Sequence, residues 1–466
     1  MNASISMIDS AIIILFLVAN LLIGFYGSKK IRTFSEYSVW QRSFGSFAIC
    51  ATLSASFIGG GYTMGNAAKV YSIGMIYAFG LLGFSLKEIL VAWLIAPKMH
   101  QYTDCHSVGD IMGKHYGLTI KMITGVFSVL ICMGILGAQV SAIGALFTTF
   151  FHMGPLLGIL IGFGVMIAYA AAGGMRSIVY TDMLQFLVLL IGIPLTFFVG
   201  LHHIGGWHVI ENTLPASKIN PFLHLHNVWV LGGLVLTFIF GEILVPPYMQ
   251  RLFMAKSTKQ TQRATFWAGI ISMPIFIIAG AIGLVALVMH PHLDPNLAIP
   301  YVIQHAVPIG IKGIVIASLL AVIMSSAAGF LNAAAIAFTS DIAMPFCKKR
   351  EISAQTLLRL ARLASIVVGI GAVVFALAIS NILDILIYAY NLWAPIILVP
   401  LLAAMFGLKI TPKHFYVSGG LGLIATLIWS LGLHEPFQLT ANVVGVAVSF
   451  VAFVCVYCLS QMGNQC

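Results

Sequence analysis

Apolar residues along this chain fall into runs of about 20 residues or more, separated by short polar segments. A helix of that length crosses the apolar core of a bilayer, which is roughly 30 Å thick. Lipid offers the backbone no hydrogen-bond partners, so only helices and closed barrels cross it, and the runs lack the alternation of barrel strands. The pattern therefore predicts an all-α, polytopic membrane protein. Its thirteen expected transmembrane helices lie at 8–28, 42–66, 73–96, 118–150, 155–172, 178–200, 227–250, 264–289, 312–340, 356–380, 383–405, 415–432 and 440–460.

Composition supports lipid as the solvent of this chain, because 60% of its residues are hydrophobic and only 8% are charged. The net charge of +10 is explained by membrane sidedness and requires no nucleic-acid partner. With the amino terminus outside, 19 of the 23 lysines and arginines fall on the cytoplasmic side, where positive charge accumulates; the other four are Lys69, Lys87, Lys218 and Lys312. We expect a multi-pass protein of the plasma membrane, or of the bacterial inner membrane in a prokaryote, with its amino terminus outside, its carboxyl terminus inside and no protein partner evident.

Two of the apolar runs are interrupted. In the second run, residues 54–61 are small and end in three glycines, which hold a helix weakly. In the seventh run, Gly241 and Glu242 precede Pro246 and Pro247, which lack an N–H donor and clash with the preceding turn. The interrupted runs are five apart, which favours an inverted repeat, although such stretches also serve packing or kinks in ordinary membrane helices. The expected divisions are an N-terminal anchor helix and cytoplasmic loop (1–41), a first repeat of five helices (42–226), a second repeat of five helices (227–405) and two C-terminal helices (406–466).

Polar side chains inside the runs are costly in lipid and are therefore candidates for ion and solute binding. Ser325 and Ser326 stand in the ninth run, where their hydroxyl oxygens suit a hard monovalent cation, but such serines also commonly bond their own i−4 carbonyl. Glu242 either faces a cationic group of a solute or takes part in ion coupling, or else it pairs with Lys87 or binds unwound backbone. Asp182 is placed near the cytoplasmic start of the sixth run, where we expect it to be solvated.

The most specific stretch of the sequence is residues 173–185, which contains paired glycines, a Thr-Asp and a Gln. It resembles the signature of the sodium:solute symporter family, whose members include proline, glucose, pantothenate and choline transporters. Residues 57–61, residues 250–251, and residues 324–326 with Asp341 resemble further blocks of that family, so the resemblance spans nearly the whole chain. It implies a five-plus-five inverted-repeat core with discontinuous first and sixth core helices, and it is closest to the choline-transporter branch.

The resemblance also implies a site for sodium as a co-transported ion. In this family the ion lies between the first and eighth core helices, held by backbone carbonyls of the first and hydroxyls of the eighth. Carried over by the matching blocks, this implies as ligands the carbonyl oxygens of Ile49, Thr52 and Val322 and the side-chain oxygens of Ser325 and Ser326. Asp182 matches the signature aspartate, which in relatives is associated with the path of the ion toward the cytoplasm.

The solute is expected to bind beside the two interruptions. Candidate solute-binding residues are Phe57, Gly59, Gly60, Tyr62, Gln139, Glu242, Tyr248, Tyr388 and Asn391. The carboxylate of Glu242, with Tyr62, Tyr77 and Tyr248 nearby, suits a cationic solute through charge and cation–π contact. Neither interruption, however, carries the tryptophan that a cage for a quaternary amine favours. A small amine or amino acid is therefore placed ahead of a carboxylate.

These observations predict a sodium-coupled symporter that carries a small organic solute into the cell by alternating access. The alternatives are a sodium-coupled carboxylate or vitamin symporter, and a solute-sensing membrane domain that does not transport. A channel would need a continuous polar pore, and the few charges within the runs do not line up on any helix. An enzyme is excluded, because no nucleophile, base and oxyanion donors converge by spacing.

Overall fold

The computed structural model describes residues 5–223, 225–346, 353–378, 391, 393–436 and 439–463. Within these ranges the secondary structure is helical, and the only extended pairing is an isolated bridge between Phe44 and Ala255. The helices before the second interruption are α1 (Met7–Ser28), α2 (Phe34–Val39), α3 (Ser46–Phe57), α4 (Asn66–Ile73), α5 (Ile76–Gly80), α6 (Leu82–Leu94), α7 (Val108–Tyr116), α8 (Leu118–Phe151), α9 (Pro155–His203), α10 (Trp207–Thr213), α11 (Ala216–Ile219) and α12 (Leu225–Gly241). After it follow α13 (Pro246–Phe253), α14 (Thr258–Met289), α15 (Ala298–Ala306), α16 (Ile311–Ala337), α17 (Met344–Phe346), α18 (Ala354–Ala378), α20 (Val399–Met405), α21 (Pro412–Leu427) and α22 (Ala441–Gly463).

Several of these helices are long enough to cross a bilayer. Nine in the described part of the chain meet the requirements of length and apolarity, or eleven if each of two bent pairs forms one span. The predicted all-α, polytopic fold is confirmed. The predicted number of thirteen spans stays a prediction, because residues 379–390, in and beside the eleventh run, lie outside the described residues.

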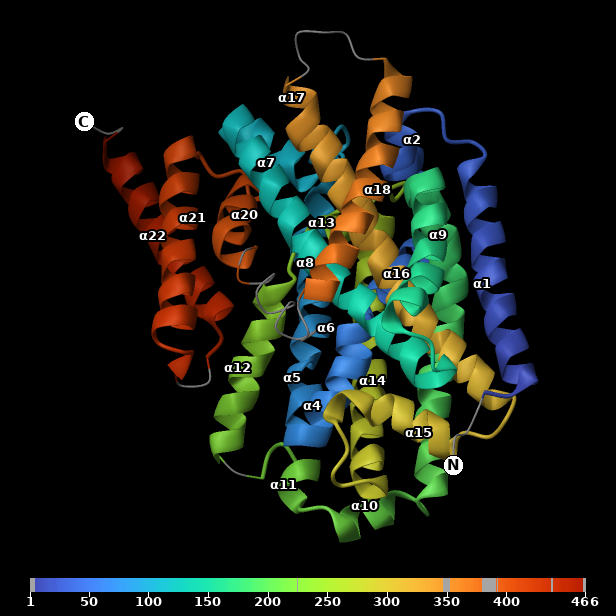
Figure 1. Ribbon diagram of the computed structural model, residues 1–466. Helices are drawn as coiled ribbons and strands as arrows, with labels where there is room; N and C mark the ends of the chain where they lie inside the picture. The colour runs from blue at the N-terminus through green and yellow to red at the C-terminus, as the bar shows by residue number, and fades with distance from the viewer. Residues whose placement is uncertain are drawn as a thin grey trace.

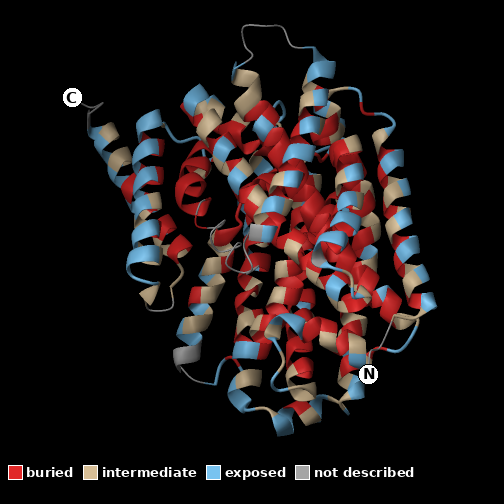
Figure 2. Ribbon diagram, viewed as in Figure 1, coloured by how far each residue is buried: buried red, intermediate tan, exposed pale blue. Residues whose placement is uncertain are grey.

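The helices form a bundle with α7 and α17 at one end and α10, α11 and α15 at the other (Figure 1). Buried positions concentrate in the middle of the bundle, and exposed ones on the outer helices α1, α21 and α22 (Figure 2). Large apolar side chains are exposed on these outer helices, for example Leu22 and Phe450. Such side chains tolerate exposure when the surrounding solvent is lipid.

The longest helix, α9, contains two of the predicted runs and bends between them. Its 49 residues would extend about 74 Å if straight, far more than a bilayer core requires. Gly174 interrupts the helical geometry with φ 52° and ψ −143°. A side chain there would also collide with Tyr37, since an added Cβ would lie 2.4 Å from its carbonyl oxygen. Glycine is thus required on both grounds, and the chain divides near the predicted boundary.

Both predicted interruptions are present. The axes of 46–57 and 61–73 differ by 57°, and those of 228–241 and 246–253 by 58°. At the first break the chain leaves α3 at Ile58 and resumes in a π-helical turn at Gly61–Gly65. At the second, α13 begins with Pro246 and Pro247, whose missing N–H groups cost nothing in the first turn of a helix.

Helix α16 lies at the centre of the bundle and packs against α1, α3, α8 and α9. Within residues 311–346, an apolar stretch of 18 residues is 94% buried. Its first turn is held by Asp9 of α1, whose carboxylate Oδ1 accepts from the backbone N–H groups of Gly310 and Gly313 at 2.8 and 2.7 Å. A carboxylate satisfies the otherwise unpaired donors there and interacts favourably with the helix dipole. This contact anchors the helix that carries Ser325 and Ser326.

Candidate functional site

The carboxylate of Asp182 lies at the junction of four helices, beside the first break. It belongs to α9 and is fully buried. Its Oδ1 accepts from the hydroxyl of Ser325 on α16 at 2.6 Å, and its Oδ2 accepts from the hydroxyl of Thr52 on α3. Arg251 of α13 completes the set with an ion pair of 3.3 Å to Oδ2. The expectation of a solvated Asp182 was wrong, because helix packing encloses this part of α9.

Arg251 is the second fully buried charge of this junction. Its Nε donates to Thr52 Oγ1 at 2.9 Å, its Nη2 to Ser56 Oγ at 2.5 Å, and its Nη1 to the carbonyl of Pro247 at 2.9 Å. This arginine was counted among the basic residues of the cytoplasmic side, and the structure buries it within the bundle. Its guanidinium group extends from α13 into the bundle, where Gly329 leaves room for it, since a Cβ there would lie 2.8 Å from Nη2.

The predicted sodium ligands flank this junction. Thr52 and Ser325 share one carboxylate, and Ile49 and Val322 are buried one helical turn before them. Ser325 donates its single hydroxyl proton to Asp182, so it does not bond its own i−4 carbonyl. A hydroxyl that donates to a carboxylate keeps its lone pairs for other partners. Asp182 therefore orients both hydroxyl groups. Ser325 keeps its lone pairs for a cation, and Thr52 keeps one, because the other accepts from Arg251.

Ser326 lies beside the first break. An added Cβ on Gly59 would be 2.8 Å from the Ser326 hydroxyl oxygen, so only glycine permits this approach. The next residue, Gly60, donates its backbone N–H to Gln139 Oε1 on α8 at 3.1 Å. A cavity of about 60 Å³ opens next to Gly60 and is also lined by Pro300 of α15. Four predicted site residues thus meet here, and this break presents small residues and backbone groups.

A second cluster of buried charge lies at the other break. Lys87 of α6 forms an ion pair of 2.6 Å with Glu88, and its ammonium donates to the backbone carbonyl of Glu242 at 3.3 Å. Tyr248 donates its hydroxyl to Glu242 Oε2 at 2.5 Å. All four of these side chains are buried. Glu242 contacts Lys87 through its backbone carbonyl, and its carboxylate accepts from Tyr248, while its role toward a solute stays a prediction.

Aromatic side chains surround this second cluster. The Lys87 ammonium lies 3.5 Å from the ring centroid of Phe84, 4.9 Å from that of Tyr248 and 5.5 Å from that of Phe57. Tyr62 packs on Phe84 with ring centroids 5.0 Å apart. Phe57, Tyr62, Glu242 and Tyr248 were predicted as solute-binding residues, and the structure brings them together around a lysine that was not.

Of the two remaining candidate solute-binding residues, Asn391 is buried and Tyr388 lies outside the described residues. Lys87 and Arg251 were not predicted as site residues. The signal for Lys87 was present, since a charge in the middle of an apolar run is costly. For Arg251 the only signal was the resemblance of residues 250–251 to a family block.

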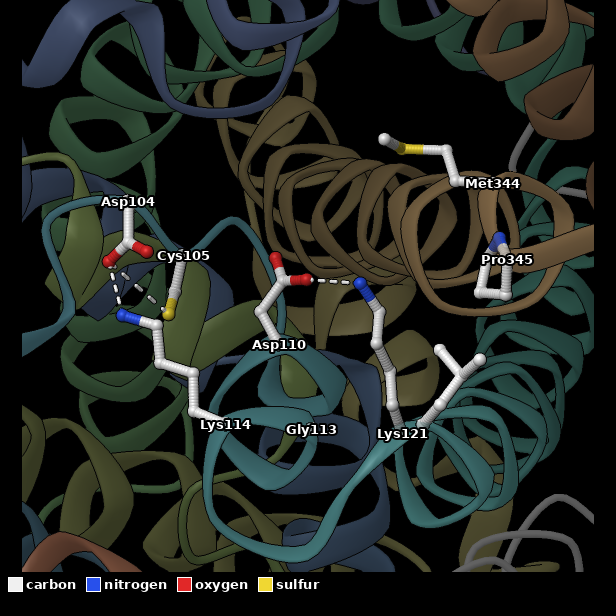
Figure 3. A pocket seen from close by; sticks show the side chains of 9 residues that line it. Asp104, Cys105, Asp110, Gly113, Lys114, Lys121, Met344 and Pro345 are labelled. Atoms are coloured by element: carbon white, nitrogen blue, oxygen red, sulfur yellow. Dashed lines mark hydrogen bonds and ion pairs between the residues drawn. The ribbon is translucent and has the colours of Figure 1, made fainter. Parts of the chain in front are cut away.

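A separate charged cavity of about 380 Å³ opens at the α7 end of the bundle. In it Lys114 pairs with Asp104, and Lys121 pairs with Asp110 at 2.6 Å (Figure 3). The hydrogen bond from Lys114 holds the pKa of Asp104 below its usual value. Burial opposes the charge on Asp110, but Lys121 outweighs burial, so its pKa is also lowered. Lys121 also lies 3.9 Å from Oδ1 of the buried Asp341, so one lysine serves two carboxylates.

Comparisons with known proteins show the family of this chain. A family model described as the sodium:solute symporter family matches residues 37–420. The osmoregulated proline transporter OpuE of Bacillus subtilis (strain 168) is 24% identical, with 94% of this chain and 93% of that protein covered. High-affinity choline transporter 1 of Drosophila melanogaster is 25% identical, with 82% of this chain and 63% of that protein covered.

One solved structure is similar over almost its whole length. It is the substrate-bound outward-open state of a Na⁺-coupled sialic acid symporter, with a TM-score of 0.85 and 20% identity, covering 97% of this chain and 98% of that one. The likeness shows a shared fold.

Proposed function

Because this chain belongs to the sodium:solute symporter family, we propose that it carries a small organic solute into the cell together with sodium by alternating access. Membership makes the chain a membrane transporter and not an enzyme, and it gives sodium as the coupling ion. The relatives named above include a proline transporter and a choline transporter, and an amine or amino acid was favoured from the sequence. Carboxylate and vitamin solutes are the alternative.

The orientation follows from the basic residues. The α7 end of the bundle is the cytoplasmic end, with α1 beginning outside and α22 ending inside. In this arrangement the two halves, 42–226 and 227–405, form the inverted repeat. Each half contains one of the two breaks, as expected for a site that alternates between the two sides of the membrane.

Sodium binds between α3 and α16 in this proposal. The supporting observation is that Thr52 and Ser325, on different helices, direct their hydroxyl protons to one carboxylate, Asp182. The lone pairs of Ser325, and the one lone pair of Thr52 that does not accept from Arg251, are thereby available to a cation, together with the carbonyls of Ile49, Thr52 and Val322 and the hydroxyl of Ser326. Asp182 is a positioning residue of this site and also borders the path of the ion toward the cytoplasm.

Coupling follows from the position of this ion site. An ion held between α3 and α16 links the broken helix to the central one and stabilises the arrangement of Gly59 and Gly60 beside Ser326. A solute that contacts the break then binds more tightly with sodium than without it, and each ligand raises the affinity of the other. Entry of one positive charge contributes about 2.3 kcal/mol per 100 mV of membrane potential.

The first test removes the hydroxyl ligands. The double change Ser325→Ala with Ser326→Ala is expected to raise the sodium concentration for half-maximal uptake at least tenfold in proteoliposomes. The matched control is Ser318→Ala, a buried serine of the same helix whose hydroxyl bonds the carbonyl of Val315 at 2.7 Å. The control should keep the wild-type sodium dependence. An unchanged sodium dependence in the double variant would contradict the site.

The solute is found by a screen. Sodium-dependent thermal stabilisation of the purified protein identifies solutes that bind the folded state, without a prior choice of candidate. Each solute so found is then tested for uptake driven by a sodium gradient. Stabilisation without uptake would identify the chain as a solute-sensing membrane domain instead.

A further inference from the structure

The aromatic cluster at the second break contains an ammonium group of the protein itself. Lys87 is fully buried, and its Nζ lies 3.5 Å from the ring centroid of Phe84. The ring faces of Tyr248 and Phe57 are at 4.9 and 5.5 Å. Glu88 supplies a carboxylate at 2.6 Å. Aromatic faces with a nearby carboxylate are the features by which proteins recognise the ammonium group of a ligand.

The cluster is assembled from both halves of the candidate solute site. Phe57 is the last residue of α3 before the first break, and Tyr248 lies in the first turns of α13 after the second. Their rings are in edge contact, with centroids 4.7 Å apart. The Lys87 ammonium also donates to the carbonyl of Glu242, within the second break. The lysine therefore occupies the position where a solute between the two breaks would place a cationic group.

We propose that Lys87 is a tethered substitute for a solute ammonium group, so that the wild-type site selects solutes that carry no cation at this position. The inference rests on the proposed transport function and narrows its substrate class. It disfavours the amines expected from the sequence.

The physical reason is that the Lys87 ammonium already occupies the aromatic ring faces of this cluster. A second ammonium ion could not reach the same ring faces without lying within a few ångströms of the first, in surroundings that screen charge poorly. The ion pair with Glu88 keeps the lysine in place, because leaving either charge unpaired in a buried site is strongly unfavourable. Lys87 and Glu88 are also neighbours on α6, so the pair does not depend on how other helices move.

Truncating Lys87 should convert the cluster into a binding site. Lys87→Ala removes three carbons and the ammonium, which is the size of propylammonium. We expect this variant to melt below the wild type, and propylammonium to restore its melting temperature with a saturable dependence on concentration. Potassium chloride at the same concentrations serves as the ionic control. The wild type should respond to propylammonium no more than to potassium.

Two further variants keep the test decisive. Lys87→Ala with Glu88→Gln also removes the carboxylate that pairs with Lys87, so it remains available if Lys87→Ala does not fold, and it should bind propylammonium at least tenfold more weakly than Lys87→Ala does. Lys312→Ala is the control for removing a buried lysine, since Lys312 donates to the carbonyl of Gln304 at 3.0 Å near the start of α16. It should gain no response to propylammonium.

Specific results would overturn the inference. Saturable, sodium-dependent stabilisation of the wild type by choline or propylammonium would do so, as would the absence of a propylammonium response in both truncated variants. The sodium response of the wild type and of the Ser325 and Ser326 variant reports on the proposed function separately. Sodium coupling can therefore stand while the assignment of Lys87 fails, and the two failures are distinguishable.

Discussion

Two buried ion pairs lie beside the two helix breaks, and they differ in how far apart their partners are along the chain. Asp182 and Arg251 are 69 positions apart and come from α9 and α13, with an N–O distance of 3.3 Å. Lys87 and Glu88 are adjacent on α6, with an N–O distance of 2.6 Å. All four residues are at most 2% exposed.

This difference decides what each pair responds to. The carboxylate of Asp182 keeps its partners only while α3, α9, α13 and α16 stay together, since Thr52 and Ser325 also donate to it. A movement of any of these helices removes partners from a buried charge, which is costly. The Lys87 pair is carried on one helix and stays intact when that helix moves. The first pair therefore responds to the conformation of the bundle, whereas the second keeps the Lys87 ammonium paired in every conformation.

The largest effect is expected from Arg251→Met. It leaves the carboxylate of Asp182 buried without its ion partner, which typically costs about 3–5 kcal/mol of folding free energy. The folded fraction and melting temperature of the purified variant in nanodiscs measure this loss. Asp182→Asn in the same chain removes the uncompensated charge and should recover most of the stability. Equal instability of the single and double variants would show that the pair is not the cause.

A smaller effect is expected from Thr52→Ala. The change removes the hydroxyl that donates to Asp182 and accepts from Arg251, but the two charges still pair with each other, so we expect a loss of about 1.5–3 kcal/mol, the worth of one hydrogen bond to a charged group. Thr52→Ser keeps the hydroxyl and is the matched control. The melting temperature should fall in the alanine variant, and its apparent sodium affinity should fall with it. A serine variant that behaves like the alanine variant would contradict the role given to the hydroxyl.

The Lys87–Glu88 pair can be tested through Phe84, whose ring lies against the Lys87 ammonium. The coupling between Phe84→Leu and Lys87→Met, measured by a double-mutant cycle of unfolding free energies, should be about 1–2 kcal/mol, as for a desolvated cation over a ring. The Asp182 pair provides the negative control, because Phe84→Leu combined with Thr52→Ala should be additive. A coupling near zero between Phe84 and Lys87 would show that the ring does not stabilise the ammonium group.

The comparison also separates what the sequence could predict from what it could not. The two breaks follow from local chemistry, three glycines in one run and two prolines in the other, and both were predicted at their correct places. The pairing of Ser325 with Asp182 joins residues 143 positions apart. It depends on the rotation of α16 about its axis, and a helix buried on all sides carries no polar face from which that rotation can be read.

Charge counting gave no sign that Arg251 is buried, for a related reason. Counting assigns a charge to the nearest end of an apolar run, but a long side chain can extend from a short helix such as α13 into the interior. The two residues were each placed near the cytoplasm, although together they compensate one another inside the bundle. Lys87, by contrast, was recognisable as a buried charge, because it stands in the middle of its run.

The smallest effect is expected from the exposed pair at the α7 end, where Lys114→Gln should change the unfolding free energy by less than about 0.5 kcal/mol at physiological salt. The side chains are 38% and 68% exposed for Lys114 and Asp104, so water screens their interaction. The pKa of Asp104 is lowered by the hydrogen bond, so its small stabilisation is present at neutral pH and is lost as the pH falls through the lowered value. Burial works against the charge on Lys114, but Asp104 outweighs it and raises the pKa of the ammonium, so the contribution of Lys114 is lost only as the pH rises through that raised value. Melting curves of Lys114→Gln and the wild type should therefore coincide closely at pH 7. A loss as large as that of Thr52→Ala would mean that exposure does not separate the two kinds of pair.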